Sequence, residues 1–103
     1  QLEYLFCYGT LQDPQVQESV FGRWLNGKTD AVTGFQKMEN AVYGRYPIVA
    51  HTGNPKHKVK GMAYEVSAVD LKKADRYETE AYKRELFTLE SGAKAWIYVE
   101  NSN

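Results

Sequence analysis

Apolar and polar positions along the first quarter of the chain predict a strand followed by a helix. Residues 2–8 are apolar at nearly every position, which is typical of a strand buried on both faces at the centre of a sheet. Asp13 followed by Pro14 is a typical helix start, with an aspartate N-cap and proline at the first helical position. Four apolar side chains then recur at helical spacing: Val16, Val20, Phe21 and Trp24. We expect Gly27 to end this helix.

The middle of the chain predicts three strands. Residues 28–38 are rich in Thr, Val and Phe and predict a strand that bends at Gly34. Residues 41–50 predict a second strand, which a glycine and a proline interrupt. A turn cluster at 52–55 separates it from residues 59–66, whose alternating pattern predicts a third strand.

The last third of the chain predicts a helix and a β-hairpin. Ser67 offers an N-cap, Asp70 completes a partial capping box, and the helix is expected to end near Glu78. Residues 82–89 alternate as a strand, and residues 95–99 pair back with them. About six strands, mostly consecutive, and two helices indicate an α+β fold. We expect a small mixed, mostly antiparallel sheet, curled into a barrel and flanked by the two helices.

Length and composition restrict the class of protein. The chain has 103 residues, which fits one domain over residues 1–103. Its 13 basic and 13 acidic residues balance, whereas a nucleic-acid-binding protein shows a basic excess. No apolar run reaches the ~18 residues of a membrane span, and no signal-peptide pattern is visible. With a single cysteine as well, these features predict a cytoplasmic protein without nucleic-acid or membrane partners, and they leave the oligomeric state open.

The sequence does not predict a metal site, but its tyrosine content is compatible with a pocket. His51, His57 and Cys7 fit no structural zinc spacing, so we do not expect a metal site. The chain has eight tyrosines, each with an apolar ring and a polar tip. Such side chains suit either a core wall or an apolar pocket with a few hydrogen-bonding groups. Trp24 and Trp96 are expected to serve packing.

The first candidate site is the corner Tyr8-Gly9-Thr10-Leu11, where the first predicted strand ends. Consecutive N–H groups at a strand-to-helix corner can bind a carboxylate or phosphate without a cation. Glycine lets a ligand approach the backbone, and Thr10 adds a hydroxyl donor. Taken alone, the segment is more typical of an ordinary strand-end turn. Cys7 precedes it, and strand alternation favours a buried thiol there over a nucleophile.

The second candidate site is Asp75-Arg76-Tyr77-Glu78 at the end of the second helix. Asp75 and Glu78 are three residues apart and therefore share a helix face. The partial negative charge of the terminal carbonyls disfavours an anion at Glu78, and shielding by aromatic rings would raise its pKa toward neutrality. A carboxyl group of that pKa suits general base and acid catalysis. The alternatives are a solvated carboxylate or one paired with Arg76 or Arg84.

Five segments carry a resemblance to a known family. They are Tyr8-Gly9-Thr10-Leu11, Tyr46-Pro47-Ile48-Val49, Gly61-Met62-Ala63-Tyr64-Glu65-Val66, Asp75-Arg76-Tyr77-Glu78 with Tyr82-Lys83-Arg84, and Ala95-Trp96-Ile97-Tyr98-Val99. In this order they resemble the gamma-glutamylcyclotransferase-like family. The first segment resembles its substrate loop, and the fourth resembles the helix that carries its catalytic glutamate. The resemblance spans nearly the whole chain.

The resemblance implies a small mixed barrel with flanking helices around one polar-ended cavity. It also implies cleavage of a γ-glutamyl amide by the substrate's own α-amine, which releases 5-oxoproline and an amine or amino acid without cofactor or metal. The amides of the Tyr8–Leu11 loop, including Gly9, would bind the substrate carboxylate, and Glu78 would act as general base and then acid. Tyr46 and Tyr82 would line the substrate site. Thr10 or Tyr82 would stabilise the developing oxyanion.

Two residues depart from the family pattern. The family usually has Leu before the Asp of its glutamate motif and Gly after the Glu, where this chain has Ala74 and Thr79. Ala74 leaves more room beneath the helix, and Thr79 restricts the backbone directly after Glu78. Both departures bear on substrate and turnover more than on the fold. The alternative function is a non-catalytic module that binds a small carboxylate in the same cavity and does not need Glu78.

Overall fold

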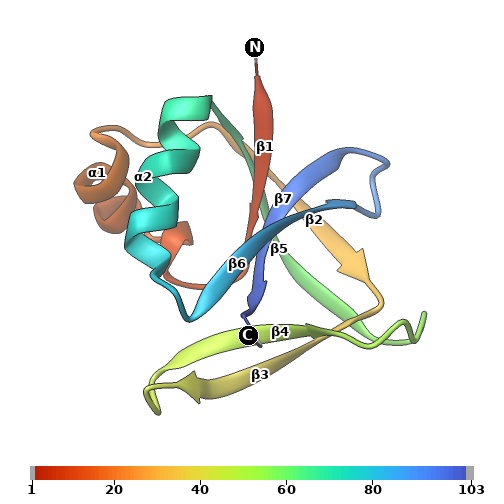
Figure 1. The fold of residues 1–103 in the computed structure, drawn as a ribbon. Helices are drawn as coiled ribbons and strands as arrows, with labels where there is room; N and C mark the ends of the chain where they lie inside the picture. Colours follow the sequence, from red (N-terminus) through yellow and green to blue (C-terminus); the bar gives the residue numbers. More distant parts are fainter. Residues whose placement is uncertain (1, 102–103) are drawn as a thin grey trace.

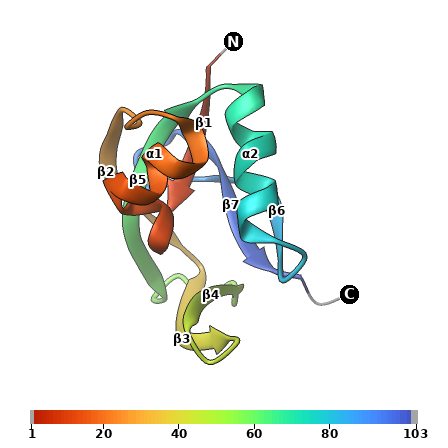
Figure 2. The ribbon, with the colours of Figure 1, turned by 90° about the vertical axis from the view of Figure 1, so that its left-hand side faces the viewer.

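The structure, a computed structural model, describes residues 2–101, and Figures 1 and 2 show its strands and helices from two sides. In chain order the elements are β1 (Glu3–Cys7), the 3-10 turn η1 (Thr10–Gln12), α1 (Pro14–Phe21), β2 (Gly27–Thr33), β3 (Phe35–Val42), β4 (Tyr46–His51), β5 (Lys58–Val66), α2 (Ala68–Glu78), β6 (Tyr82–Thr88) and β7 (Lys94–Glu100). The α+β class is therefore confirmed.

A five-stranded sheet carries the fold, in the order β2-β5-β1-β7-β6. β1 lies at its centre, where Phe6 pairs with Ala63 of antiparallel β5 and with Ile97 of parallel β7. The remaining neighbours in this sheet are antiparallel. A mixed, mostly antiparallel sheet around a buried first strand is thus confirmed. The helices pack together at one side of the sheet, and the β3–β4 hairpin lies apart from them against β5 and β7 (Figure 1).

Two details of the strand prediction are wrong. Residues 28–38 form two strands and not one, because Gly34 has a φ of 82° and turns the chain into a second sheet. The Gly34 carbonyl then accepts hydrogen bonds from the N–H groups of Thr52 and Gly53, at 2.8 and 3.1 Å, which fix the corner. Residues 41–50 divide around a turn at Gly44, as predicted, but Pro47 lies within β4 and does not interrupt it. Because β3 and β4 form their own two-stranded sheet, the main sheet does not close into a barrel.

The first helix begins as predicted and ends early. The Asp13 carboxylate caps α1 by accepting a hydrogen bond from the Gln15 N–H at 2.9 Å. Gly22, with a φ of 79°, ends the helix, so Gly27 begins β2 instead. Trp24 consequently lies beyond the helix and is 69% exposed, so the prediction that it serves packing is wrong. Within residues 2–101, neither helix is long and apolar enough to cross a membrane.

The second helix has the predicted cap and the predicted end. The Ser67 hydroxyl accepts a hydrogen bond from the Asp70 N–H at 3.1 Å, and the Asp70 carboxylate accepts one from the Ser67 N–H at 2.8 Å. Arg23, just after α1, donates two further hydrogen bonds to the buried Asp70, at 2.8 and 2.7 Å. This ion pair joins the two helices, and α2 runs on to Glu78.

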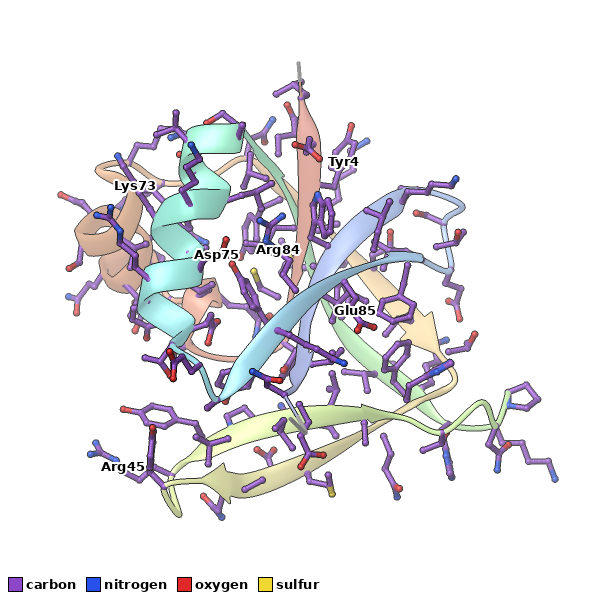
Figure 3. The ribbon with its side chains drawn as sticks, in the orientation of Figure 1. Tyr4, Arg45, Lys73, Asp75, Arg84 and Glu85 are labelled. Carbon is purple, nitrogen blue, oxygen red and sulfur yellow. The ribbon has the colours of Figure 1, made fainter. Side chains whose placement is uncertain are left out.

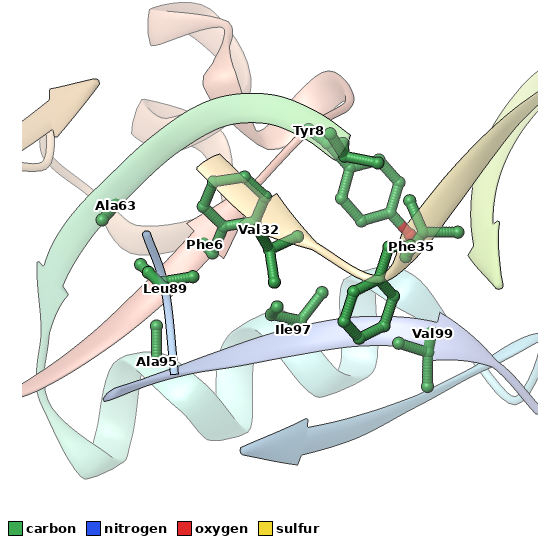
Figure 4. Packing of buried hydrophobic residues seen from close by; sticks show 11 residues of the cluster. Phe6, Tyr8, Val32, Phe35, Ala63, Leu89, Ala95, Ile97 and Val99 are labelled. Atoms are coloured by element: carbon green, nitrogen blue, oxygen red, sulfur yellow. The ribbon is translucent and has the colours of Figure 1, made fainter. Parts of the chain in front are cut away.

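Alternation along β1 divides the core into two layers. Phe6 and Tyr8 point into one apolar cluster, which the β3–β4 hairpin helps to enclose (Figure 4). Leu5 and Cys7 point to the opposite face, where residues of the helices such as Leu71 cover them. A fully buried side chain of this size contributes about 1.5–3 kcal/mol by leaving water. The end of β1, between these layers, borders the cavity described next.

Candidate active site

A cavity of about 380 Å³ opens where the corner after β1, the C-terminal end of α2 and the tip of the β3–β4 hairpin meet. All residues that the sequence predicted to be catalytic or substrate-binding line it: Tyr8, Gly9, Thr10, Leu11, Tyr46, Glu78 and Tyr82. It is also lined by residues that the sequence did not single out as binding residues: Phe6, Cys7, Val42, Tyr43, Arg45, Pro47, Tyr77, Thr79 and Tyr98. Apolar and aromatic walls with a few polar groups suit a small, polar-ended molecule.

Glu78 is the only carboxyl group among the described residues that line the cavity. It is the last residue of α2, and its side chain is half-buried. None of the ion pairs formed within residues 2–101 includes it. Burial therefore acts unopposed and raises the pKa of Glu78 from 4.5 to about 7. A carboxyl group that titrates near neutrality can both accept and return a proton at physiological pH.

Asp75, one turn before Glu78, faces the sheet instead (Figure 3). Arg84 on β6 donates two hydrogen bonds to its carboxylate, at 2.9 and 3.0 Å, and the Tyr98 hydroxyl on β7 donates a third at 2.6 Å. Burial alone would raise the pKa of Asp75, but these bonds outweigh it, so the pKa is lowered. The guanidinium of Arg84 also lies 4.4 Å from the Trp96 ring centre. Arg84, which the sequence offered as a partner for Glu78, is thus paired with Asp75 instead. This ion pair fixes the last turn of α2.

Thr79 follows Glu78 in a backbone conformation that residues other than glycine avoid, with φ 66° and ψ −174°. For them this conformation costs about 1–3 kcal/mol. The Thr79 N–H bonds to the Asp75 carbonyl at 3.2 Å, and its hydroxyl accepts a bond from the Ala81 N–H at 3.4 Å. The restriction expected after Glu78 therefore takes the form of backbone strain. Ala74, the other departure from the family pattern, is fully buried in the apolar cluster beneath the helices.

The corner after β1 presents backbone groups to the cavity. A Cβ atom at Gly9 would lie 3.3 Å from the Pro47 ring, so glycine permits the close approach of β4. Thr10 and Leu11 begin η1, and the first N–H groups of a helical turn have no carbonyl one turn earlier to bond. The Thr10 hydroxyl lies 2.7 Å from the Tyr77 hydroxyl on α2. Because one hydroxyl donates its proton to the other, the proton of the accepting hydroxyl is not used within the pair.

Two other tyrosine hydroxyls are engaged by the backbone. Tyr8 donates a hydrogen bond to a β7 carbonyl, and Tyr82 donates one to the Pro47 carbonyl at 2.6 Å. Burial raises the pKa of both, that of Tyr82 to about 12, so both remain protonated at neutral pH. The Tyr82 hydroxyl proton is therefore engaged by Pro47 here, and the assignment of Thr10 or Tyr82 as oxyanion donor stays a prediction.

Cys7 is part of the cavity wall. Its side chain is buried, as the alternation of the strand predicted, and its thiol contacts the Leu5 carbonyl at 3.9 Å. Burial, and to a smaller degree the nearby Glu78, raise the pKa of the thiol well above its ordinary value. A neutral thiol is a poor nucleophile. Over residues 2–101, no group of three or more His, Cys, Asp or Glu side chains is placed to hold a metal ion.

Sequence reasoning missed the tip of the β3–β4 hairpin. Tyr43 and Gly44 have φ values of 55° and 67°, as the central residues of a tight type I′ turn do, and the Arg45 N–H bonds to the Val42 carbonyl at 3.0 Å. This turn places Tyr43 and Arg45 at the exposed mouth of the cavity, with the Arg45 guanidinium 5.5 Å from the Tyr46 ring centre. Along the sequence, an arginine after a Tyr-Gly pair is indistinguishable from any exposed turn.

The sequence matches the family described as "Gamma-glutamyl cyclotransferase, AIG2-like" over residues 5–103. The chain belongs to this family. The resemblance drawn from the five sequence segments is thereby confirmed. No curated protein matches the chain.

Solved structures show the same fold as this member of the gamma-glutamyl cyclotransferase family. At3g28950.1 from Arabidopsis thaliana is 21% identical with a TM-score of 0.84, and the match covers 98% of this chain but 63% of the plant protein. An AIG2-like protein from Mus musculus is 20% identical with a TM-score of 0.73, over 100% of this chain and 80% of the mouse chain. A gamma-glutamyl cyclotransferase is 11% identical with a TM-score of 0.75, over 97% and 67% of the two chains. This chain therefore spans less than two thirds of the plant protein.

Proposed function

We propose that this chain is a γ-glutamyl cyclotransferase, which cleaves a γ-glutamyl amide by internal cyclisation and releases 5-oxoproline with an amine or amino acid. One observation carries the proposal. Glu78, a carboxyl group with a pKa near 7, lies in the same tyrosine-lined cavity as the backbone amides of residues 9–11. Membership of the family supports the same reaction.

The glutamyl part of the substrate matches the inner cavity group by group. Its α-carboxylate would accept hydrogen bonds from the N–H groups of residues 9–11, where η1 begins. Its α-ammonium would lie against the carboxylate of Glu78, since opposite charges attract strongly in a partly buried site. The side chains of Phe6 and Leu11 would contact the methylene groups between these two ends.

The reaction then needs neither water nor an external nucleophile. Glu78 accepts one proton from the substrate's α-ammonium, and the resulting amine attacks the γ-carbonyl carbon to form the C–N bond of a five-membered lactam. The original amide C–N bond breaks, and Glu78 returns its proton to the departing nitrogen. A second proton passes from the ring nitrogen to the same amine, which leaves as an ammonium ion. Atoms and charges therefore balance without a co-reactant.

The protein's main contribution is to hold the substrate bent. Because nucleophile and carbonyl belong to one molecule, fixing a near-attack conformer supplies much of the rate enhancement. Negative charge develops on the γ-oxygen during attack. The hydroxyl pair of Thr10 and Tyr77 would donate its free proton there, and one such donor typically contributes about 3 kcal/mol.

Release of 5-oxoproline from a panel of γ-glutamyl amides, measured by mass spectrometry, tests this proposal. Wild-type protein is expected to release it, and Glu78→Gln is expected to lower kcat at least ~100-fold because the base is lost. Glu80→Gln is the matched control, since this exposed carboxylate lies two residues away and outside the cavity. We expect the control variant to keep the wild-type rate.

One result would favour the non-catalytic alternative. If no amide yields 5-oxoproline, and a γ-glutamyl amide binds equally well to wild type and to Glu78→Gln, the cyclotransferase proposal is wrong. The cavity would then serve as a binding site for a small carboxylate. The strain at Thr79, directly beside the proposed base, is the observation that keeps this alternative in view.

A further inference from the structure

Only two charged side chains stand among the described residues that line the cavity, and they lie at different depths. Glu78 is half-buried at the end of α2, whereas Arg45 is exposed at the tip of the β3–β4 hairpin. Arg45 takes part in none of the ion pairs formed within residues 2–101. Its guanidinium therefore gives the mouth of the cavity a positive charge that no neighbouring carboxylate neutralises.

The position of Arg45 is fixed by its own hairpin. The turn at Tyr43 and Gly44 closes through the hydrogen bond from the Arg45 N–H to Val42. The guanidinium then lies 5.5 Å from the centre of the Tyr46 ring, within the range of a cation–π contact. The side chain is thus held at one side of the mouth, with all five guanidinium donors free of any carboxylate partner among the described residues.

The proposed reaction dictates which part of the substrate faces this charge. The glutamyl part occupies the inner cavity, because both Glu78 and the amides of residues 9–11 must reach it. The leaving nitrogen and its substituent consequently extend toward the exposed side of the cavity, where Tyr43 and Arg45 lie. A carboxylate on that substituent would meet an arginine suited to bidentate binding, whereas an ammonium would meet a like charge.

We infer that Arg45 is a specificity-determining residue, whose guanidinium binds a carboxylate on the leaving amine. The inference rests on the proposed function and narrows its substrate class. The protein discriminates in favour of γ-glutamyl amides whose leaving group is a carboxylate-bearing amino acid or peptide. It discriminates against γ-glutamyl polyamines and other amides with a cationic leaving group.

Two substrates that differ only in the carboxylate provide the test: γ-glutamyl-alanine and γ-glutamyl-ethylamide. Wild type is expected to favour the alanine amide about fivefold in kcat/KM, which is the upper end for one solvent-exposed ion pair. Arg45→Gln should bring the two values within about twofold, through loss of the alanine amide's advantage alone. Arg45→Lys should keep part of the preference, because its charge remains and the bidentate geometry is lost.

A matched control tests whether the preference depends on where the positive charge lies or only on the total charge of the protein. Lys60→Gln removes an exposed positive charge on β5, outside the cavity, and is expected to leave the preference unchanged. Raising the salt concentration should reduce the wild-type preference, because ions screen an exposed charge pair. Equal kcat/KM for both amides in wild type and Arg45→Gln would overturn the inference and leave the cyclotransferase proposal intact. An equal decrease for both amides in Arg45→Gln would overturn it too, since Arg45 would then act on the shared glutamyl part.

Binding measurements distinguish the inference from the reaction on which it rests. In the Glu78→Gln background, calorimetry gives the dissociation constants of both amides without turnover. Tighter binding of the alanine amide, lost on adding Arg45→Gln, would support carboxylate selection even if wild type released no 5-oxoproline, in which case the cyclotransferase proposal alone would fail. Equal binding of the two amides in the Glu78→Gln background would overturn the selection.

Discussion

The acidic residues at the two ends of α2 have different hydrogen-bond and ion-pair partners. At the N-terminal end, Ser67 and Asp70 cap each other, and Arg23 holds the buried carboxylate with two hydrogen bonds. At the C-terminal end, Glu78 has no ion pair within residues 2–101, and Thr79 has a strained backbone. The helix dipole widens the difference, because it stabilises an anion at the first end and destabilises one at the second. One helix thus has an ion-paired, capped acidic residue at its first end and the proposed base at its second.

The two carboxyl groups accordingly have pKa values shifted in opposite directions. The bonds from Arg23 lower the pKa of Asp70 from 3.8 to about 2, while burial raises the pKa of Glu78 from 4.5 to about 7. Asp70 therefore contributes stability above pH 4, which is lost as the pH falls toward 2. Glu78 affects stability in the opposite direction. Burial favours its protonated form in the folded state, so the free energy of unfolding falls as the pH rises from about 4.5 to 7.

The largest expected effect is on the pH dependence of turnover. Because only ionised Glu78 can accept a proton, kcat/KM should rise about tenfold per unit below pH 7 and level off above it. Between pH 5 and pH 8 the change amounts to roughly 100-fold, measured as 5-oxoproline release in a constant-ionic-strength buffer series. The residual activity of Glu78→Gln should lack this rise. A wild-type profile that is flat from pH 5 to 8 would exclude Glu78 as the base.

A smaller effect is expected at the other end of the helix. Asp70→Asn should lower the free energy of unfolding by about 2 kcal/mol at pH 7, since it removes the ion pair with Arg23 and weakens the cap. Urea denaturation followed by circular dichroism measures this loss, which should shrink to about half at pH 3. The pH profile of turnover should be unchanged. An equal loss of stability at pH 3 and pH 7 would contradict the shifted pKa of Asp70.

The smallest expected effect concerns the strained residue itself. Thr79→Gly should raise the free energy of unfolding by about 1 kcal/mol, because relief of strain exceeds the entropy that glycine adds to the unfolded chain. Thr88→Gly at the exposed end of β6 is the control, where no positive φ needs relief, and it should lower stability by about 1 kcal/mol. Thermal unfolding of both variants gives the comparison. A loss of stability at both positions would show that Thr79 stores no strain.

The parts of the fold that local chemistry determines were predictable from the sequence. The caps of both helices follow from single residues, Asp13 and Ser67, and the apolar run of β1 places it inside the sheet. The sequence also predicted the bend at Gly34, but it did not predict that the chain enters a second sheet there. Whether a bent strand stays in one sheet or enters a second depends on the later partners of each half, such as the bonds from Thr52. Those partners are tertiary and leave no local pattern.

The same distinction applies to the site. Glu78 and the corner at Gly9 were found because each is unusual within its own element, as an acid at a helix C-terminus or a glycine ending a buried strand. Arg45 and Tyr77 are ordinary within theirs, as a turn residue and an exposed helix residue. Arg45 lies at the mouth of the cavity only because the hairpin is placed opposite α2. Tyr77 takes part in the site only because the Thr10 hydroxyl approaches its own hydroxyl.

The central position of β1 has a consequence for how the chain acquires its structure. β1 is synthesised first, yet its two partners, β5 and β7, belong to the second half of the chain, and β7 is the last strand. Pairings between distant segments incur a loop-closure entropy before any contact compensates it, so such topologies fold slowly. The middle of the sheet can therefore assemble only after translation has produced β7. Until then the apolar β1 remains an open edge, and this interval is when the nascent chain is most exposed to aggregation.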